Sequence, residues 1–381
     1  MTAEPRFLLI GLGHIGRYVY PCYSSVLGPR LGRDMLAVKA GAAGLEELQA
    51  RYPFPIRGDG DCAAAARDIR PDVILIACRP PQVRPIVEQQ LKPYFDLCRA
   101  QGRTLPLLIS YAPAPRVTWF RDCLGEGVLA ANVIPNMEHY TAGVCTASIT
   151  HNLVTLDHRA AWPEDGLAFL RRYLAPQGLY LPCRVEESLP LLSAKVISHR
   201  LYDSCLLLAE GFGAAGREVG HDQVAEAGRA YLRSWPEDFP PDVRPCSGHR
   251  LPRSLRPMVE RTLRAWYDGI MEVCLAHGVR RDIGGSFLRG MFDLNLLTVS
   301  LSDREGLARN IRHHSTPGGL QERSCLDFAA AGAEELREAA RRFAAGESDP
   351  DFPGRWRQRV ARLNEGLIDF GRDMDKGRNE N

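Results

Sequence analysis

Apolar runs of strand length alternate with longer amphipathic stretches through the first 150 residues of the chain. The runs are bounded by glycine, proline and polar residues, and the stretches between them, such as residues 15–26, have helical length. Strands that alternate with helices form a parallel sheet covered on both faces. The pattern predicts an open, doubly wound α/β domain with strands just before residue 11 and at residues 35–38, 72–78, 105–111 and 128–135.

The second half of the chain shows helical periodicity instead, with apolar residues recurring every three or four positions. Residues 234–257 are rich in proline and arginine and are expected to be irregular. Residues 201–204 and 266–269 begin similar helices, which a partial duplication, an insertion between them or chance would explain. An all-α domain is therefore predicted, with helices at residues 201–216, 263–277, 287–300, 333–345 and 356–370.

The composition is that of an ordinary globular protein. The 381 residues are 45% hydrophobic and 25% charged, with a formal net charge of +2. This balance disfavours nucleic acid and membranes as partners, and no apolar run reaches membrane length. The start of the sequence has no secretory pattern, so a cytoplasmic location is expected. Because the 11 cysteines occur singly, without the spacing of a zinc site, we expect reduced thiols and no metal site.

A glycine-rich turn, with Gly11, Gly13 and Gly16, directly follows the first predicted strand. In a dinucleotide-binding turn the first glycine makes a tight turn, the second lets the backbone approach the phosphates, and the third lets the helix pack on the strand. The helix N-terminus adds N–H donors and a partial positive charge. This turn, with His14 and Ile15 in it, is therefore predicted to hold a dinucleotide cofactor.

Lys39 ends the second predicted strand, the position that selects the cofactor in such folds. An acidic residue there binds the ribose 2′-hydroxyl of NAD, whereas a basic residue suits the 2′-phosphate of NADP. Lys39 therefore favours NADP, with NAD as a possible cofactor. A solvated lysine at a strand end is the alternative interpretation.

Three later strands end in segments suited to line a cleft: residues 79–82, 110–113 and 135–139. In open α/β sheets, ligands bind beyond the carboxyl ends of the strands. These segments are therefore expected to converge on one crevice.

These segments together resemble the pyrroline-5-carboxylate reductase family, over roughly residues 5–212 and 265–330. Residues 313–322 are similar to the segment that lines the substrate site in that family. The motifs occur in the family's order and read GLGHIG, ILIACRPPQ, LLISYAPA, ANVIPNMEHYTAGVCTASI and HHSTPGGLQE.

The resemblance implies reduction of a cyclic imine by NAD(P)H in a homodimer or larger homo-oligomer. It implies a Rossmann-type cofactor domain at 1–155, with a strand-rich extension to about 185, and a helical substrate and dimerisation domain at 186–381. An irregular insertion is expected near 213–262, where the chain departs from the family. Together with Lys39 and His14, which are placed from the sequence pattern alone, the expected cofactor contacts are Gly11, Gly13, Ile15, Gly16, Ala77, Arg79, Pro80, Pro135 and Asn136. The implied substrate contacts are Glu138, Ser315, Gly318, Gly319 and Gln321, with Thr316 as a catalytic candidate.

The chain departs from that family at three positions. Arg79 stands where the family has a lysine, and Leu320 and Gln321 replace the threonines that help to seat the substrate. These departures favour a related imine or carbonyl substrate of a different shape.

Residues 193–199 resemble a second group, the β-hydroxyacid dehydrogenases, in which a lysine and a polar residue about four positions later act at the hydride acceptor. The segment is predicted to begin a helix, with Lys195 and His199 on one face. Lys195 would then protonate the atom left by hydride addition. A solvated helix lysine is the alternative interpretation.

Three functions follow from these patterns. The first is an NAD(P)H-dependent imine reductase acting on a small molecule derived from an amino acid. The second is a 3-hydroxyacid or 2-oxoacid dehydrogenase that uses Lys195. The third is a non-catalytic nucleotide-binding protein on the same fold, because the substrate motif is altered.

Overall fold

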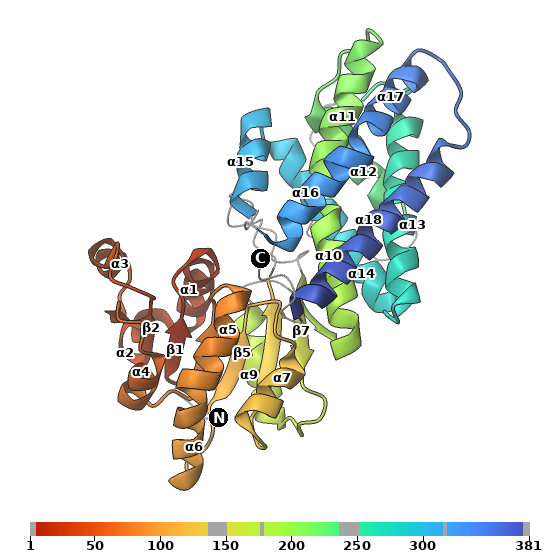
Figure 1. Cartoon of the computed structure of the whole chain (residues 1–381). Helices are drawn as coiled ribbons and strands as arrows, with labels where there is room; N and C mark the ends of the chain where they lie inside the picture. The colour runs from red at the N-terminus through yellow and green to blue at the C-terminus, as the bar shows by residue number, and fades with distance from the viewer. Residues whose placement is uncertain (1–4, 136–150, 176–178, 236–250, 315–317, 376–381) are drawn as a thin grey trace. The chain divides into compact units, whose positions relative to one another are not determined.

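The computed structural model describes residues 5–135, 151–175, 179–235, 251–314 and 318–375. The chain divides into two compact units (Figure 1). Among the described residues, those up to 135, at 152–185 and at 374–375 form the sheet unit, and those at 186–373 belong to the helical unit. The predicted fold class, an α/β region followed by an all-α region, is confirmed.

The sheet unit contains one eight-stranded sheet in the order β3-β2-β1-β4-β5-β6-β7-β8. The pairs from β3 to β6 are parallel, and β7 runs antiparallel to β6. The order reverses beside β1, which lies between β2 and β4. The strands are β1 (Phe7–Ile10), β2 (Met35–Val38), β3 (Ile56–Arg57), β4 (Val73–Ile76), β5 (Leu107–Ser110), β6 (Ala130–Ile134), β7 (His151–Leu156) and β8 (Leu179–Cys183).

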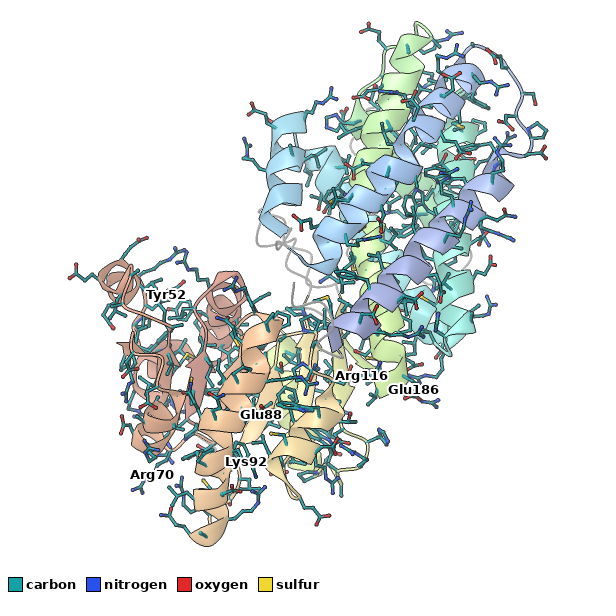
Figure 2. The ribbon with its side chains drawn as sticks, viewed as in Figure 1. Tyr52, Arg70, Glu88, Lys92, Arg116 and Glu186 are labelled. Carbon is teal, nitrogen blue, oxygen red and sulfur yellow. The ribbon has the colours of Figure 1, made fainter. Side chains whose placement is uncertain are left out.

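Helices cover both faces of this sheet because its strands are apolar on both faces. In β1, Phe7 and Leu9 pack on one side with α1 and α9, while Leu8 and Ile10 pack on the other with α4, α6 and α7. The side chains that fill these layers are drawn in Figure 2. The helices are α1 (His14–Leu27), α2 (Leu31–Asp34), α3 (Leu45–Arg51), α4 (Cys62–Ile69), α5 (Pro80–Ile86), α6 (Lys92–Ala100), α7 (Val117–Leu124) and α9 (Glu164–Leu174).

The helical unit packs its helices closely enough to require glycine at crossings. A Cβ on Gly211 of α11 would lie 2.3 Å from the Arg337 carbonyl oxygen of α17, and one on Gly269 of α13 would lie 2.6 Å from the Arg357 carbonyl oxygen of α18. The helices are α10 (Val185–Ser198), α11 (Leu201–Ala214), α12 (His221–Arg233), α13 (Arg256–Ala276), α14 (Arg281–Leu301), α15 (Arg304–His314), α16 (Leu320–Ala331), α17 (Ala333–Ala344) and α18 (Phe352–Asp375).

Two local expectations were wrong. Residues 221–233, inside the expected irregular insertion, form α12, whose buried Val224, Ala225 and Leu232 make an amphipathic face against α14. Residues 193–198 end a helix rather than begin one, because α10 starts at Val185 and runs through them.

Within the described residues, no helix combines the length and the apolar character needed to cross a membrane.

Candidate active site

The three glycines of the turn after β1 have two different roles. Gly11 has a φ of +97°, and a Cβ there would lie 2.8 Å from the Ala77 carbonyl oxygen. A Cβ on Gly16 would lie 2.1 Å from the Gly11 carbonyl oxygen, whereas a Cβ on Gly13 would meet nothing within 4 Å. Packing therefore requires the first and third glycines, and the second leaves its backbone open to a ligand.

The N-terminus of α1 follows this open position. Gly13 is the N-cap residue and has no side chain to cap the helix, and the first turn contains no acidic residue. The Arg17 side chain donates to the Leu12 carbonyl oxygen at 3.3 Å. Free first-turn N–H groups and the helix dipole favour an anion here. Ile15 packs partly buried against the sheet core, and the His14 side chain lies outside the described part.

Lys39 lies directly after β2, as predicted, and is half-buried. Its Nζ donates to the Gly41 carbonyl oxygen at 3.0 Å. The neighbouring Arg57, at the end of β3, forms ion pairs with Asp59 and Asp68, and the hydrogen bond that it donates to Asp59 is the main cause of its raised pKa. The Lys39 ammonium therefore donates to a neutral carbonyl oxygen, whereas the charge of Arg57 is already paired with two carboxylates.

The loop after β4 contains three predicted cofactor residues. The Ala77 N–H donates to the Ile10 carbonyl oxygen at 2.8 Å, which joins this loop to the glycine turn. Arg79 is exposed and caps α5, where Pro80 is the first residue. Cys78, between Ala77 and Arg79, is half-buried, and burial raises the pKa of its thiol to about 11.

The loop after β5 is held by Asn132 of β6, a residue with no predicted role. Asn132 is buried, and its Nδ2 donates to the carbonyl oxygens of Ala112 and Pro115, each at 3.2 Å. Pro135, after β6, is buried. The predicted Asn136 and Glu138 lie outside the described residues.

In the helical unit, Lys195 lies in the last turn of α10 and is half-buried. The Ser198 hydroxyl donates to the Lys195 carbonyl oxygen at 2.7 Å and accepts from the Nδ2 of Asn295 on α14 at 3.0 Å. His199, 5% exposed, lies in the turn after α10. The expectation that one helix face carries both Lys195 and His199 was therefore wrong, because the helix ends between them.

The predicted substrate turn is described only from Gly318. Gly318 has a φ of +70°, and its N–H donates to the Glu322 carboxylate at 2.7 Å. Gly319 is the N-cap of α16, and Gln321 in its first turn is 9% exposed. The Glu322 carboxylate thus accepts from the Gly318 N–H, a donor that was expected to face the substrate. Ser315 and Thr316 lie outside the described part.

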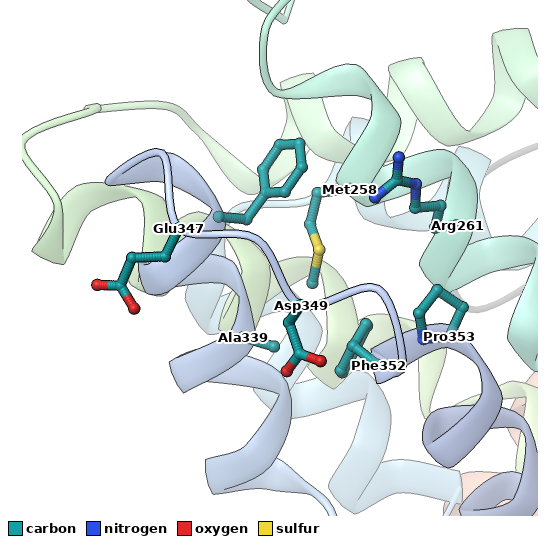
Figure 3. A pocket seen from close by; sticks show the side chains of 8 residues that line it. Met258, Arg261, Ala339, Glu347, Asp349, Phe352 and Pro353 are labelled. Atoms are coloured by element: carbon teal, nitrogen blue, oxygen red, sulfur yellow. The ribbon is translucent and has the colours of Figure 1, made fainter.

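A shallow hollow, with a cavity volume of about 10 Å³, lies among α13, α17 and α18 of the helical unit (Figure 3). None of the predicted site residues lines it. It is bordered by Met258, Arg261, Ala339, Phe343, Glu347, Asp349, Phe352 and Pro353. Across the described parts of both units, no group of three His, Cys, Asp or Glu residues could hold a metal ion.

No protein-family model matches this chain, and no curated protein matches it. Among solved structures, the chain is similar to D-mandelate dehydrogenase in complex with NADH, at 10% identity and a TM-score of 0.44, over 98% of this chain and 99% of that one. It is also similar to a pyrroline-5-carboxylate reductase from Coxiella burnetii, at 12% identity and a TM-score of 0.40, over 90% and 97%. A third similar structure is the NADP-bound pyrroline carboxylate reductase from Plasmodium falciparum, at 10% identity and a TM-score of 0.37, over 91% and 99%. Two of these three structures are thus named as pyrroline carboxylate reductases.

Proposed function

We propose that this chain is an NAD(P)H-dependent oxidoreductase that reduces the C=N bond of a cyclic imine derived from an amino acid. The observation that carries the proposal is the open backbone at Gly13, between two glycines that packing requires and at the start of α1. This turn lies beside β1, where the strand order reverses. Dinucleotides bind at that point in open α/β sheets.

In this proposal the sheet unit binds and orients the cofactor. Gly11, Gly13 and Gly16 shape the turn, and the first N–H groups of α1 donate to the pyrophosphate. Lys39 is the candidate contact for the 2′-phosphate, which makes NADP the expected cofactor. When bound, the reduced nicotinamide supplies the hydride. Asn132 fixes the loop after β5 through two hydrogen bonds and so acts as a positioning residue.

Lys195 is the candidate proton donor. Its backbone carbonyl is fixed by Ser198, which is fixed in turn by Asn295, so the turn that carries Lys195 has a defined conformation. A cationic lysine donates a proton to the nitrogen or oxygen that hydride addition leaves electron-rich. An imine that is already protonated does not need this donor.

The same residues support a second function, a 3-hydroxyacid or 2-oxoacid dehydrogenase in which Lys195 is essential. A third function, nucleotide binding without catalysis, is favoured by the bond from Gly318 to Glu322, which occupies a donor of the substrate turn.

Calorimetric titration of the purified chain with NADPH and, separately, with NADH tests the proposal. Tight binding of NADPH and weak binding of NADH support it, and justify assays with cyclic imines and then with oxo acids. If a demonstrably folded protein binds neither dinucleotide, the reductase proposal fails.

We also propose that the protein acts in the cytoplasm as a homodimer or larger homo-oligomer that associates through the helical unit. Sedimentation at several protein concentrations tests the assembly. A single monomeric species at all of them would refute it.

A further inference from the structure

Arg200 is a deeply buried cation in the helical unit, between α10 and α11. It is 1% exposed and immediately precedes α11 as its N-cap residue. Burying a guanidinium is costly unless its charge is paired and its N–H groups are hydrogen-bonded. The partners of Arg200 therefore indicate what the position is built to hold.

The partners of Arg200 among the described residues engage one of its three nitrogens. Nη1 lies 2.8 Å from the Cys325 Sγ, to which it donates, and 2.8 Å from the Asp203 carboxylate. Nε and Nη2 are buried and have no hydrogen-bond partner among the described residues. These two nitrogens share one edge of the planar guanidinium, the edge that binds a carboxylate through two parallel N–H···O bonds.

A second buried donor lies on the helix that contacts Arg200. Ser324 precedes Cys325 on α16 and is 0% exposed, and its hydroxyl has no hydrogen-bond partner in the described part of the helical unit. Gln321 lies three residues before Ser324 and four before Cys325, so these three residues share a region of the helix surface. The part of α16 that meets Arg200 is therefore polar and includes an unused hydroxyl.

We infer that the Nε–Nη2 edge of Arg200 binds the carboxylate of the substrate, with Ser324 as a further donor, so that the substrate is a carboxylate-bearing imine or oxo acid. The inference rests on the proposed function for its identification of the ligand as a substrate. The anion site itself depends only on the unpaired donors. A free inorganic anion offers similar chemistry, so the test includes phosphate beside a carboxylate.

Thermal unfolding of the full chain in acetate, phosphate, chloride and acetamide tests the anion site, with ionic strength held equal across the salts. Acetate is expected to raise the Tm of the wild type, whereas chloride and neutral acetamide are not. Arg200→Lys keeps the charge but loses the planar edge, so its affinity for acetate is expected to fall about tenfold or more. Equal effects of acetate and chloride, an equal acetate response in Arg200→Lys, or a response to phosphate alone would overturn the inference.

Two further measurements keep the test decisive. If Arg200→Lys does not fold, a crystal structure of the wild type grown in acetate replaces it, with the carboxylate expected at Nε and Nη2. A water molecule alone at that edge would refute the inference. Ser324→Ala, a smaller change, is expected to weaken acetate binding less than Arg200→Lys does.

Titration with NADPH separates this inference from the proposed function. Arg200→Lys is expected to bind NADPH as the wild type does, because Arg200 belongs to the helical unit and the glycine turn to the sheet unit. If the wild type binds acetate through Arg200 but binds no dinucleotide, the anion site stands and the reductase proposal fails. If activity is found, Arg200→Lys should raise the KM for a cyclic imine carboxylate and leave that of the same ring without a carboxylate unchanged. An equal effect on both would contradict the substrate assignment.

Discussion

Gly13→Ala separates cofactor binding from folding more cleanly than other changes in the glycine turn. The added methyl group meets no atom of the protein within 4 Å, so the turn accommodates it. The backbone at Gly13 is extended, with a φ of −74°, which alanine also adopts. Alanine is a poorer N-cap than glycine, so we expect a stability loss of up to about 1 kcal/mol. The Tm should therefore fall by only about 2–4 °C.

Dinucleotide binding should fall much further. The methyl group occupies the space through which a pyrophosphate approaches the backbone N–H groups, and a hydrogen bond to a charged group contributes about 1.5–3 kcal/mol. Loss of one such bond weakens binding about 10- to 100-fold. Calorimetric titration with NADPH measures this loss, and thermal unfolding of the same sample shows that the protein is folded.

Two other glycines provide matched controls. Gly366 lies on the exposed side of α18 with nothing within 4 Å of a Cβ, so Gly366→Ala should leave NADPH binding unchanged and stabilise the helix by about 0.5–1 kcal/mol. Gly16→Ala forces a methyl group to 2.1 Å from a carbonyl oxygen and should lower both Tm and binding. Wild-type NADPH affinity in folded Gly13→Ala would refute the reasoning about the turn.

Four further predictions concern single side chains. Lys39→Ala should weaken NADPH binding about tenfold in calorimetry and leave NADH binding unchanged, because it removes one charge at the 2′-phosphate; equal losses would contradict this role. Lys195→Ala should nearly abolish carbonyl reduction in steady-state assays and spare reduction of a protonated imine; unchanged kcat/KM on all substrates would remove Lys195 from the mechanism. With a pKa of about 11, Cys78 should react slowly with iodoacetamide at pH 8 and faster near pH 10, as mass spectrometry of the modified peptide would show; rapid labelling at pH 8 would disprove this. Burial raises the pKa of Asp157, but hydrogen bonds from Arg159 outweigh this effect and lower the pKa, so the carboxylate contributes stability above its unfolded pKa and loses it as pH falls through its folded pKa. Between pH 6 and pH 3, Asp157→Asn should therefore lose less free energy of unfolding, measured in urea, than the wild type does. An equal loss in the two proteins would rule out this role.

Short-range patterns predicted the parts of the fold that depend on short-range physics. The second strand, expected at residues 35–38, is β2, because a run of apolar residues buried on both faces marks a central strand. The glycine turn was equally predictable, since the spacing of Gly11 and Gly16 is required by the close approach of neighbouring backbone segments. Helix α12 was also predictable, because Val224, Ala225 and Leu232 have helical spacing; the proline- and arginine-rich segment that follows the helix obscured this pattern.

Boundaries without a local signal were not predictable. Helix α10 ends at Ser198 with no nearby glycine or proline to mark the end. At this end the Ser198 hydroxyl accepts a hydrogen bond from Asn295, which lies 97 residues later in the chain. A misplaced helix end then gave the wrong relation between Lys195 and His199, which depends on that boundary.

The buried charged residues of the helical unit show why some candidate binding residues could not be predicted from the sequence. Glu187 is 0% exposed and accepts from the backbone and side chain of Arg280, 93 residues away, and Asp293 is paired with Arg229 across 64 residues. Such partners leave no spacing in the sequence, because the fold alone brings them together. Once the structure shows the partners, however, each donor of a buried ion can be matched with an acceptor, since a buried ion requires partners. Arg200 differs from Glu187 and Asp293 in keeping a whole edge of donors without an acceptor among the described residues, and that difference makes it the position at which a ligand is expected.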